Sequence, residues 1–171
     1  MSRSTGDETL DEMLAGGVPA GRTLLVRGPA GVGKSRLGAQ FLRAGLAADE
    51  AGLYVATDQP RRVAAAELDL PETADLTVAA VDPHGGEGGV RFATGSDEHT
   101  VSFRTLIEEL STPDWDRVVV DGAAGLSDLA PDDRTGRRGL HALVERLDDH
   151  AATCLLTATP DEHPAVDRVV H

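Results

Sequence analysis

The fold of this chain is decided by residues 23–35, which read TLLVRGPAGVGKS. An apolar run of strand length, residues 23–27, leads directly into a glycine-rich stretch, and a helical pattern begins at Lys34. The stretch fits the spacing G-x-x-x-x-G-K-[ST], which builds a phosphate-binding loop when a strand precedes it and a helix comes after it. We therefore predict that a phosphate is bound by Gly28, Pro29, Ala30, Gly31, Val32, Gly33, Lys34 and Ser35.

The residue types in this loop suit that chemistry. Glycines at 28, 31 and 33 permit positive φ and let backbone N–H groups approach an anion. The N-terminus of the next helix adds unpaired amides and the positive end of its dipole. Lys34 would neutralise the β- and γ-phosphates of a nucleotide, and the Ser35 hydroxyl would bind Mg²⁺. The alternative is a glycine-rich turn with an incidental lysine.

A carboxylate is also expected behind the phosphates, at the end of a buried strand. Residues 118–121 read VVVD, so Asp121 ends an apolar run, 87 residues after Lys34 and two strand-helix units later. Many buried strands end in aspartate, and the order of the units is what favours a metal role here. We predict Ser35 and Asp121 as the metal residues.

Hydrolysis further needs a group that orients water in line with the γ-phosphate. Asp58 comes directly after the apolar run 53–57 and should emerge at the same sheet edge as the phosphate loop. We predict Asp58 and Lys34 as catalytic residues. Asp58 could instead cap the helix that begins near Pro60.

The wider pattern predicts an α/β fold, because strand-length apolar runs alternate with amphipathic helical segments. A mostly parallel sheet with helices on both faces is expected, as one domain over residues 1–171. Strands are predicted at 23–27, 53–57, 76–81, 117–121, 153–157 and 167–170. Helices are predicted at 10–14, 34–48, 61–68, 102–110 and 136–150. Residues 83–100 are glycine-rich and predict a flexible surface loop, with His84 and His99 as exposed loop histidines.

Composition narrows the classes of partner. The chain has 171 residues, 40% of them hydrophobic, a net charge of −13 and one cysteine. The acidic balance argues against nucleic acid as a partner, and no apolar run approaches the ~20 residues that span a bilayer. A cytoplasmic protein is expected. Fifteen arginines against one lysine, Lys34, indicate either a halophilic source or a GC-rich genome.

The amino-terminal third carries a family resemblance. Its residues are Thr5-Gly6, Leu10-Asp11-Glu12, Leu14, Gly16-Gly17-Val18-Pro19, Gly21-Arg22, the phosphate loop and Gly52-Leu53-Tyr54-Val55. This combination resembles the KaiC-like branch of the RecA superfamily of P-loop ATPases, as a short, single-domain member of haloarchaeal type. The resemblance runs from about residue 4 to 60 and resumes weakly near Asp121 and residues 155–159. It implies a three-layer RecA-like domain that binds ATP with Mg²⁺ at subunit interfaces of a homo-oligomer.

Two departures bear on activity. The family places two glutamates after its second strand, where this chain has Asp58-Gln59, one methylene shorter and with its partner neutral. Family members also continue beyond residues 169–170 to a basic residue that reaches a neighbouring subunit's nucleotide, and no such residue can be assigned here. Thr157 or Thr159 resembles the polar position that senses the γ-phosphate, or is simply a strand-end residue facing solvent.

The residues are compatible with three functions. The first is a slow Mg²⁺-dependent ATPase with a regulatory or signalling role. The second is a non-hydrolysing module whose ATP-bound state is read by a protein partner. A recombinase-like DNA-repair ATPase is the minor alternative, because residues 122–133 and 160–167 would form the DNA-binding loops and contain acids but no lysine or arginine.

Overall fold

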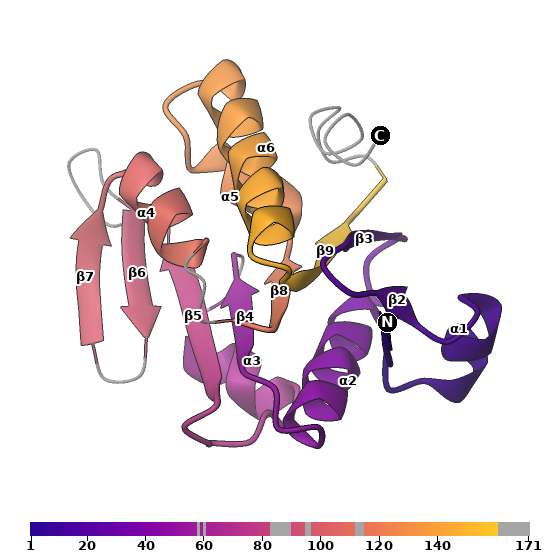
Figure 1. The fold of residues 1–171 in the computed structure, drawn as a ribbon. Helices are drawn as coiled ribbons and strands as arrows, with labels where there is room; N and C mark the ends of the chain where they lie inside the picture. The colour runs from indigo at the N-terminus through magenta and orange to yellow at the C-terminus, as the bar shows by residue number, and fades with distance from the viewer. Residues whose placement is uncertain (58, 60, 83–89, 95–96, 112–114, 161–171) are drawn as a thin grey trace.

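A seven-stranded sheet forms the centre of the molecule (Figure 1). The computed structural model describes residues 1–57, 59, 61–82, 90–94, 97–111 and 115–160. The strand order is β3-β9-β8-β4-β5-β6-β7. The first five strands are parallel, β6 pairs antiparallel with β5, and β7 pairs antiparallel with β6. The strands are β3 (Thr23–Arg27), β9 (Thr153–Ala158), β8 (Arg117–Asp121), β4 (Gly52–Ala56), β5 (Leu76–Asp82), β6 (Val90–Thr94) and β7 (Asp97–Val101).

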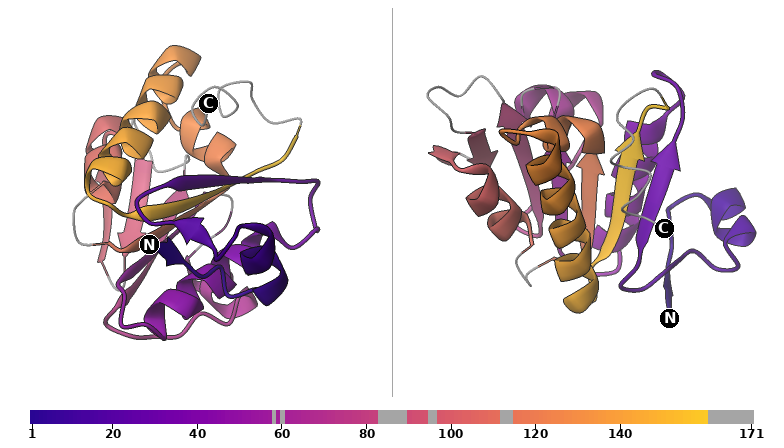
Figure 2. Two further views of the ribbon diagram at one scale, coloured as in Figure 1. Left: turned by 45° about the vertical axis from the view of Figure 1, so that its right-hand side comes forward. Right: turned by 90° about the horizontal axis from the view of Figure 1, so that it is seen from above.

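Helices cover both faces of this sheet, which confirms the predicted three-layer architecture (Figures 1 and 2). On one face lie α2 (Lys34–Leu46) and α3 (Arg61–Glu67), and on the other lie α4 (Phe103–Leu110), α5 (Ala123–Asp128) and α6 (Asp133–Asp149). Strands β4, β8 and β9 are buried throughout, as parallel strands between two helical layers must be. None of the described helices is long and apolar enough to cross a membrane.

The structure corrects the prediction of a loop over residues 83–100. Residues Val90–Thr94 and Asp97–Val101 form β6 and β7, which extend the sheet beyond β5, while 83–89 and 95–96 lie outside the described residues. Glycine content dominated that prediction, whereas the sequence VRFAT has the alternation of a strand. The predicted strand at 167–170 also lies outside the described residues.

Helices α5 and α6 show what sequence patterns miss. Residues 122–133 were expected to be a loop, but Ala123–Asp128 are helical and packed against α6. Helix α6 begins three residues earlier than predicted, because Asp132 caps it by accepting from the Thr135 amide at 2.9 Å. That hydrogen bond also lowers the pKa of the Asp132 carboxyl.

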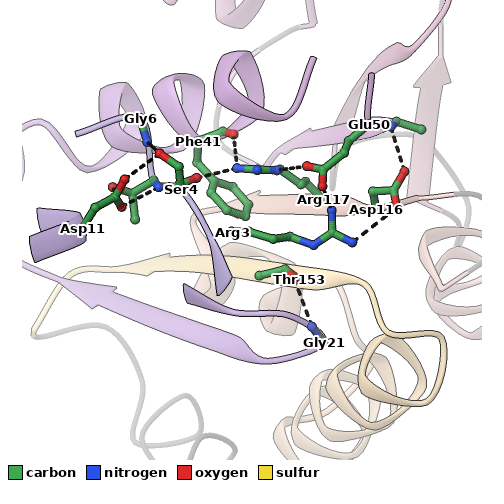
Figure 3. A network of polar contacts seen from close by, with 12 residues as sticks. Arg3, Ser4, Gly6, Asp11, Gly21, Phe41, Glu50, Asp116, Arg117 and Thr153 are labelled. Carbon is green, nitrogen blue, oxygen red and sulfur yellow. Dashed lines mark hydrogen bonds and ion pairs between the residues drawn. The ribbon is translucent and has the colours of Figure 1, made fainter. Parts of the chain in front are cut away.

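The first 22 residues form a small unit beside α2 and β3 (Figure 1). It consists of β1 (Ser2–Arg3), α1 (Glu8–Met13) and β2 (Val18–Pro19), with β1 and β2 paired. Asp11 on α1 holds the turn together: its carboxylate accepts from the Ser4 hydroxyl at 2.5 Å and from the Thr5 amide and hydroxyl, both at 2.7 Å (Figure 3). Burial acts to raise the pKa of Asp11, but the hydrogen bonds from Ser4 and Thr5 outweigh it and lower the pKa.

A buried arginine attaches this unit to the sheet (Figure 3). Arg117, 3% exposed at the start of β8, donates to Glu50 at 2.5 Å and to the main-chain oxygens of Ser4 at 2.5 Å and Phe41 at 2.8 Å. Its guanidinium also lies 4.5 Å from the centre of the Phe41 ring. Arg3 forms a second ion pair with Glu50. The start of the chain is therefore fixed next to the helix that carries the phosphate loop.

Candidate functional site

The predicted phosphate loop joins the end of β3 to the start of α2 and has an open concave side. Gly31 and Gly33 have φ of +80° and +97°, which L side chains rarely adopt. A Cβ added at either glycine would meet no atom within 4 Å. No described residue therefore fills the space on the Cβ side of these two glycines, and the loop is open there.

Lys34 lies over this loop. Its Nζ donates to the main-chain oxygens of Gly28 at 2.7 Å and Pro29 at 2.9 Å. An ammonium has three N–H groups. Two of them make these contacts and hold the loop in shape, and the third is not used by either contact. The charge is thus held at the mouth of the loop, where a phosphate would meet it.

The outer side of the loop borders a hollow of about 460 Å³. Loop residues Val32, Gly33 and Lys34 line it, together with Leu10 and Met13 of α1 and other residues of β3 and α2. Val32 is 59% exposed and Met13 is 79% exposed, so apolar surface faces solvent there. The loop is accordingly open to solvent on the side that faces α1.

Asp121 ends β8 and is 7% exposed. Its Oδ2 accepts from the Tyr54 hydroxyl at 2.5 Å, and its Oδ1 accepts from the Thr157 hydroxyl at 2.6 Å. The Thr157 hydroxyl in turn accepts from the Gly122 amide at 2.9 Å. Three adjacent strands, β4, β8 and β9, thus build one polar cluster at the carboxyl edge of the sheet.

Strand register places this cluster beneath the start of α2. Val119, two residues before Asp121, belongs to the core layer that α2 covers, so Asp121 points to the same face. A Cβ at Gly38 would lie 2.8 Å from Val119, which shows how closely α2 approaches β8. Ser35 lies one helical turn before Gly38 on that side of α2. The structure therefore brings Ser35 and Asp121 to one edge and one face of the sheet.

The predicted water-orienting residue, Asp58, lies outside the described residues. The residue before it is well placed: Thr57 is 8% exposed, and its hydroxyl lies 2.9 Å from the Asp121 main-chain oxygen and 2.8 Å from that of Gly122. Thr57 is therefore joined directly to the end of β8.

The sequence did not predict a role for one residue of the cluster, Tyr54, and left the role of another, Thr157, open between two alternatives. Tyr54 had no assigned role, because its side chain reaches Asp121 only through the pairing of β4 with β8. Thr157 was expected at the phosphate-sensing position or facing solvent; it is 1% exposed and bonded to Asp121. Thr159 is half-buried. An aromatic with a polar tip, two residues before the end of β4, is the signal that could have pointed to Tyr54.

A cation at this edge would have few protein ligands. Within the described part of the chain, no three His, Cys, Asp or Glu side chains lie close enough to hold a metal ion. Mg²⁺ suits such a site, because it keeps several waters and takes one or two protein ligands together with substrate phosphates. Ser35 and Asp121 fit that requirement.

Comparison with known proteins agrees with this geometry. The family model for the KaiC ATPase matches residues 3–169. The chain belongs to the KaiC family of ATPases. It is therefore an ATP-binding domain of KaiC/RecA type, and the predicted resemblance to the KaiC-like branch of the RecA superfamily is confirmed.

KaiC relatives align with most of this chain. The circadian clock oscillator protein KaiC of a Picosynechococcus species is 31% identical over 94% of this chain and 33% of its own length. That of Rippkaea orientalis is 29% identical over 88% of this chain and 30% of its own length. A UPF0273 protein of Saccharolobus solfataricus is 48% identical over 50 residues, which are 29% of this chain and 18% of that protein. The chain spans about a third of the length of the clock proteins it matches.

Proposed function

We propose that this KaiC-family domain binds ATP together with Mg²⁺ and hydrolyses it slowly, in a regulatory or signalling role. The observation that carries the proposal is the open loop at Gly31 and Gly33, with the Lys34 ammonium at its mouth and Asp121 on the Ser35 side of α2. The regulatory role is suggested by the relatives named as circadian clock oscillators.

Each residue would make a separate contribution. The backbone amides of residues 28–35 would surround the β-phosphate, and Lys34 would turn its remaining N–H group toward a phosphate oxygen. Ser35 and Asp121 would hold the metal, directly or through water. Bound Mg²⁺ would neutralise charge on the β- and γ-phosphates. Asp58 would orient the attacking water, and its short side chain would make turnover slow.

A second function is favoured by the Asp58-Gln59 pair. If the shorter acid does not reach the water, ATP is bound and kept, and the bound state is what a protein partner or a second copy of the chain recognises. KaiC-type domains often assemble into oligomers, and a homo-oligomer is the form we propose for that recognition.

Calorimetric titration with ATP, with and without Mg²⁺, followed by product analysis, separates these functions. The chain should be assayed at high KCl because of its net charge of −13. Phosphate released over many turnovers, and lost in Lys34→Ala and Asp58→Asn, would support the ATPase. Tight binding without release over hours would support the binding module. Absence of ATP binding, or activity unaffected by both substitutions, would reject the proposal.

A further inference from the structure

The carboxylate of Asp121 is held by two hydroxyl groups that come from the strands on either side of it. Tyr54 of β4 donates to one oxygen at 2.5 Å, and Thr157 of β9 donates to the other at 2.6 Å. Both donors are fully buried, at 0% and 1% exposure. Burying a hydroxyl is costly unless it is hydrogen-bonded, so the two hydrogen bonds to the carboxylate offset the burial of these hydroxyls.

The tyrosine ring is itself fixed in place. Tyr54 is paired with Val119 across the β4–β8 ladder, two residues before Asp121, so the phenol runs along β8 to reach the carboxylate. The ring packs under α2, where a Cβ at Gly38 would lie 3.8 Å from its Cε2 atom. Gly38 therefore leaves the space that the ring and Val119 occupy between helix and sheet.

We propose that Tyr54 is a positioning residue for the magnesium site, which orients the Asp121 carboxylate toward the Ser35 side of α2. The inference rests on the proposed function, since it assumes that Asp121 serves the metal. A carboxylate with one donor can rotate about its Cβ–Cγ bond, whereas donors on both oxygens fix its plane. Each oxygen keeps a second lone pair, which can bind Mg²⁺ as a ligand or accept a hydrogen bond from a metal-bound water.

This role predicts a selective defect. Groups that orient a metal ligand typically affect metal affinity by 10- to 100-fold. Tyr54→Phe keeps the ring and its packing but removes the hydroxyl, so we expect the affinity for ATP to fall about tenfold when Mg²⁺ is present and to stay unchanged in EDTA. Affinity without metal depends on the loop and Lys34, whereas the Tyr54 hydroxyl is bonded to Asp121.

Threonines at the two ends of β9 provide a matched control. Thr157→Val should produce the same Mg²⁺-dependent loss, and Thr157→Ser, which keeps the hydroxyl, should restore affinity. Thr153 is also fully buried, but its hydroxyl accepts from the Gly21 amide at 3.0 Å at the opposite end of the strand. Thr153→Val should therefore leave the Mg²⁺ dependence of ATP binding unchanged, even if it lowers stability.

A spectroscopic measurement reports on the contact itself. The chain has one tyrosine, so ¹³Cζ-labelled tyrosine gives one resonance, from Tyr54. We expect that resonance to shift in Asp121→Asn and again when Mg²⁺ and ADP are added to the wild-type chain.

The outcomes separate this inference from the proposed function. Wild-type binding that depends on Mg²⁺, with an identical dependence in Tyr54→Phe, would overturn the role of Tyr54 alone. A wild-type chain that binds no ATP under either condition would overturn the proposed function. A tyrosine resonance insensitive to Asp121→Asn would show that the hydroxyl does not bond to the carboxylate in solution.

Discussion

The Lys34 ammonium lies 2.7 Å from the main-chain oxygen of Gly28, the first residue of the loop that Lys34 nearly ends. The only lysine of the chain thus closes the loop upon itself. A compact ammonium can contact two carbonyls and still turn its third proton toward an incoming phosphate, whereas the donors of arginine are fixed in one plane and spread over a larger group. This difference explains why lysine occurs here in a chain that otherwise uses arginine.

Replacing Lys34 should weaken ATP binding strongly. We expect Lys34→Ala and Lys34→Arg each to lower the affinity about 10- to 100-fold by calorimetry, because a charge-assisted contact to phosphate is lost. Arg137→Ala is the control, since that exposed arginine lies on α6, across the sheet from the loop. Unchanged affinity in both Lys34 variants would exclude the loop as the phosphate site.

Two adjacent glycines should respond differently to alanine. Both have positive φ, +111° at Gly16 and +102° at Gly17, but a Cβ at Gly17 would lie 2.3 Å from the Arg3 main-chain oxygen while one at Gly16 would meet nothing within 4 Å. Gly16→Ala should cost about 1–2 kcal/mol of unfolding free energy through backbone strain alone. Gly17→Ala should cost more than about 3 kcal/mol, because β1 must also move. Equal urea midpoints would contradict this arrangement.

Asp11 should stabilise the amino-terminal unit in a pH-dependent way. Asp11→Ala removes the acceptor for Ser4 and Thr5 and should lower the free energy of unfolding by about 2 kcal/mol at pH 7, as measured in urea. The folded-state pKa lies below the ordinary value of 3.8, so this contribution is present above about pH 4 and is lost as the pH falls below it. The difference between wild type and variant should therefore shrink toward about pH 3. Glu12→Ala, the next residue of α1, should show no such trend.

The buried ion pair of Arg117 with Glu50 should contribute more to the free energy of unfolding than an exposed ion pair does. Arg117→Ala leaves Glu50 partly uncompensated and opens space beside Phe41, so we expect a loss of about 3–5 kcal/mol. Arg117→Met, which refills the volume without charge, should lose less. Arg104, whose side chain is 89% exposed and pairs with Glu108, provides the contrast: Arg104→Ala should change stability by less than about 1 kcal/mol. Similar losses for Arg117→Ala and Arg104→Ala would contradict the buried network.

Cys154 should report on unfolding. Burial raises the pKa of its thiol well above the ordinary range, and the nearby Asp148 carboxylate adds to that effect. The native thiol should therefore resist a thiol-specific reagent at about pH 8 and react fully in urea, with a transition that coincides with the loss of helical circular dichroism. Rapid labelling of the native chain would show that β9 is more accessible than the structure indicates.

Much of this fold could be predicted because its signals are local. The strands at Thr23–Arg27 and Arg117–Asp121 were predicted with their bounds, since each is a short apolar run that ends at a distinct polar or glycine residue. The pair β6 and β7 was missed because glycines around it concealed the alternation of the strands. Helix α5 was missed because its small residues give no apolar stripe; Ala123 and Ala124 are buried by close packing instead.

The candidate site was predictable only in part. The loop and Asp121 could be predicted from the sequence, because each follows an apolar run and is marked by residue types directly at the carboxyl end of that strand. The hydroxyls that hold Asp121 depend on how β4 and β9 align with β8, and a single sequence carries no local signal for that alignment. Tyr54 therefore looked like any core aromatic until the strands were set side by side.

The Thr57 hydroxyl, bound to the main chain at Asp121 and Gly122, has a mechanical consequence. It adds a side-chain link between the ends of β4 and β8, next to the pairing of Ala56 with Asp121. A shift of Asp121 on binding a cation would be transmitted through one side chain to the residue preceding Asp58. Cation binding at Asp121 and the position of Thr57 would then change together.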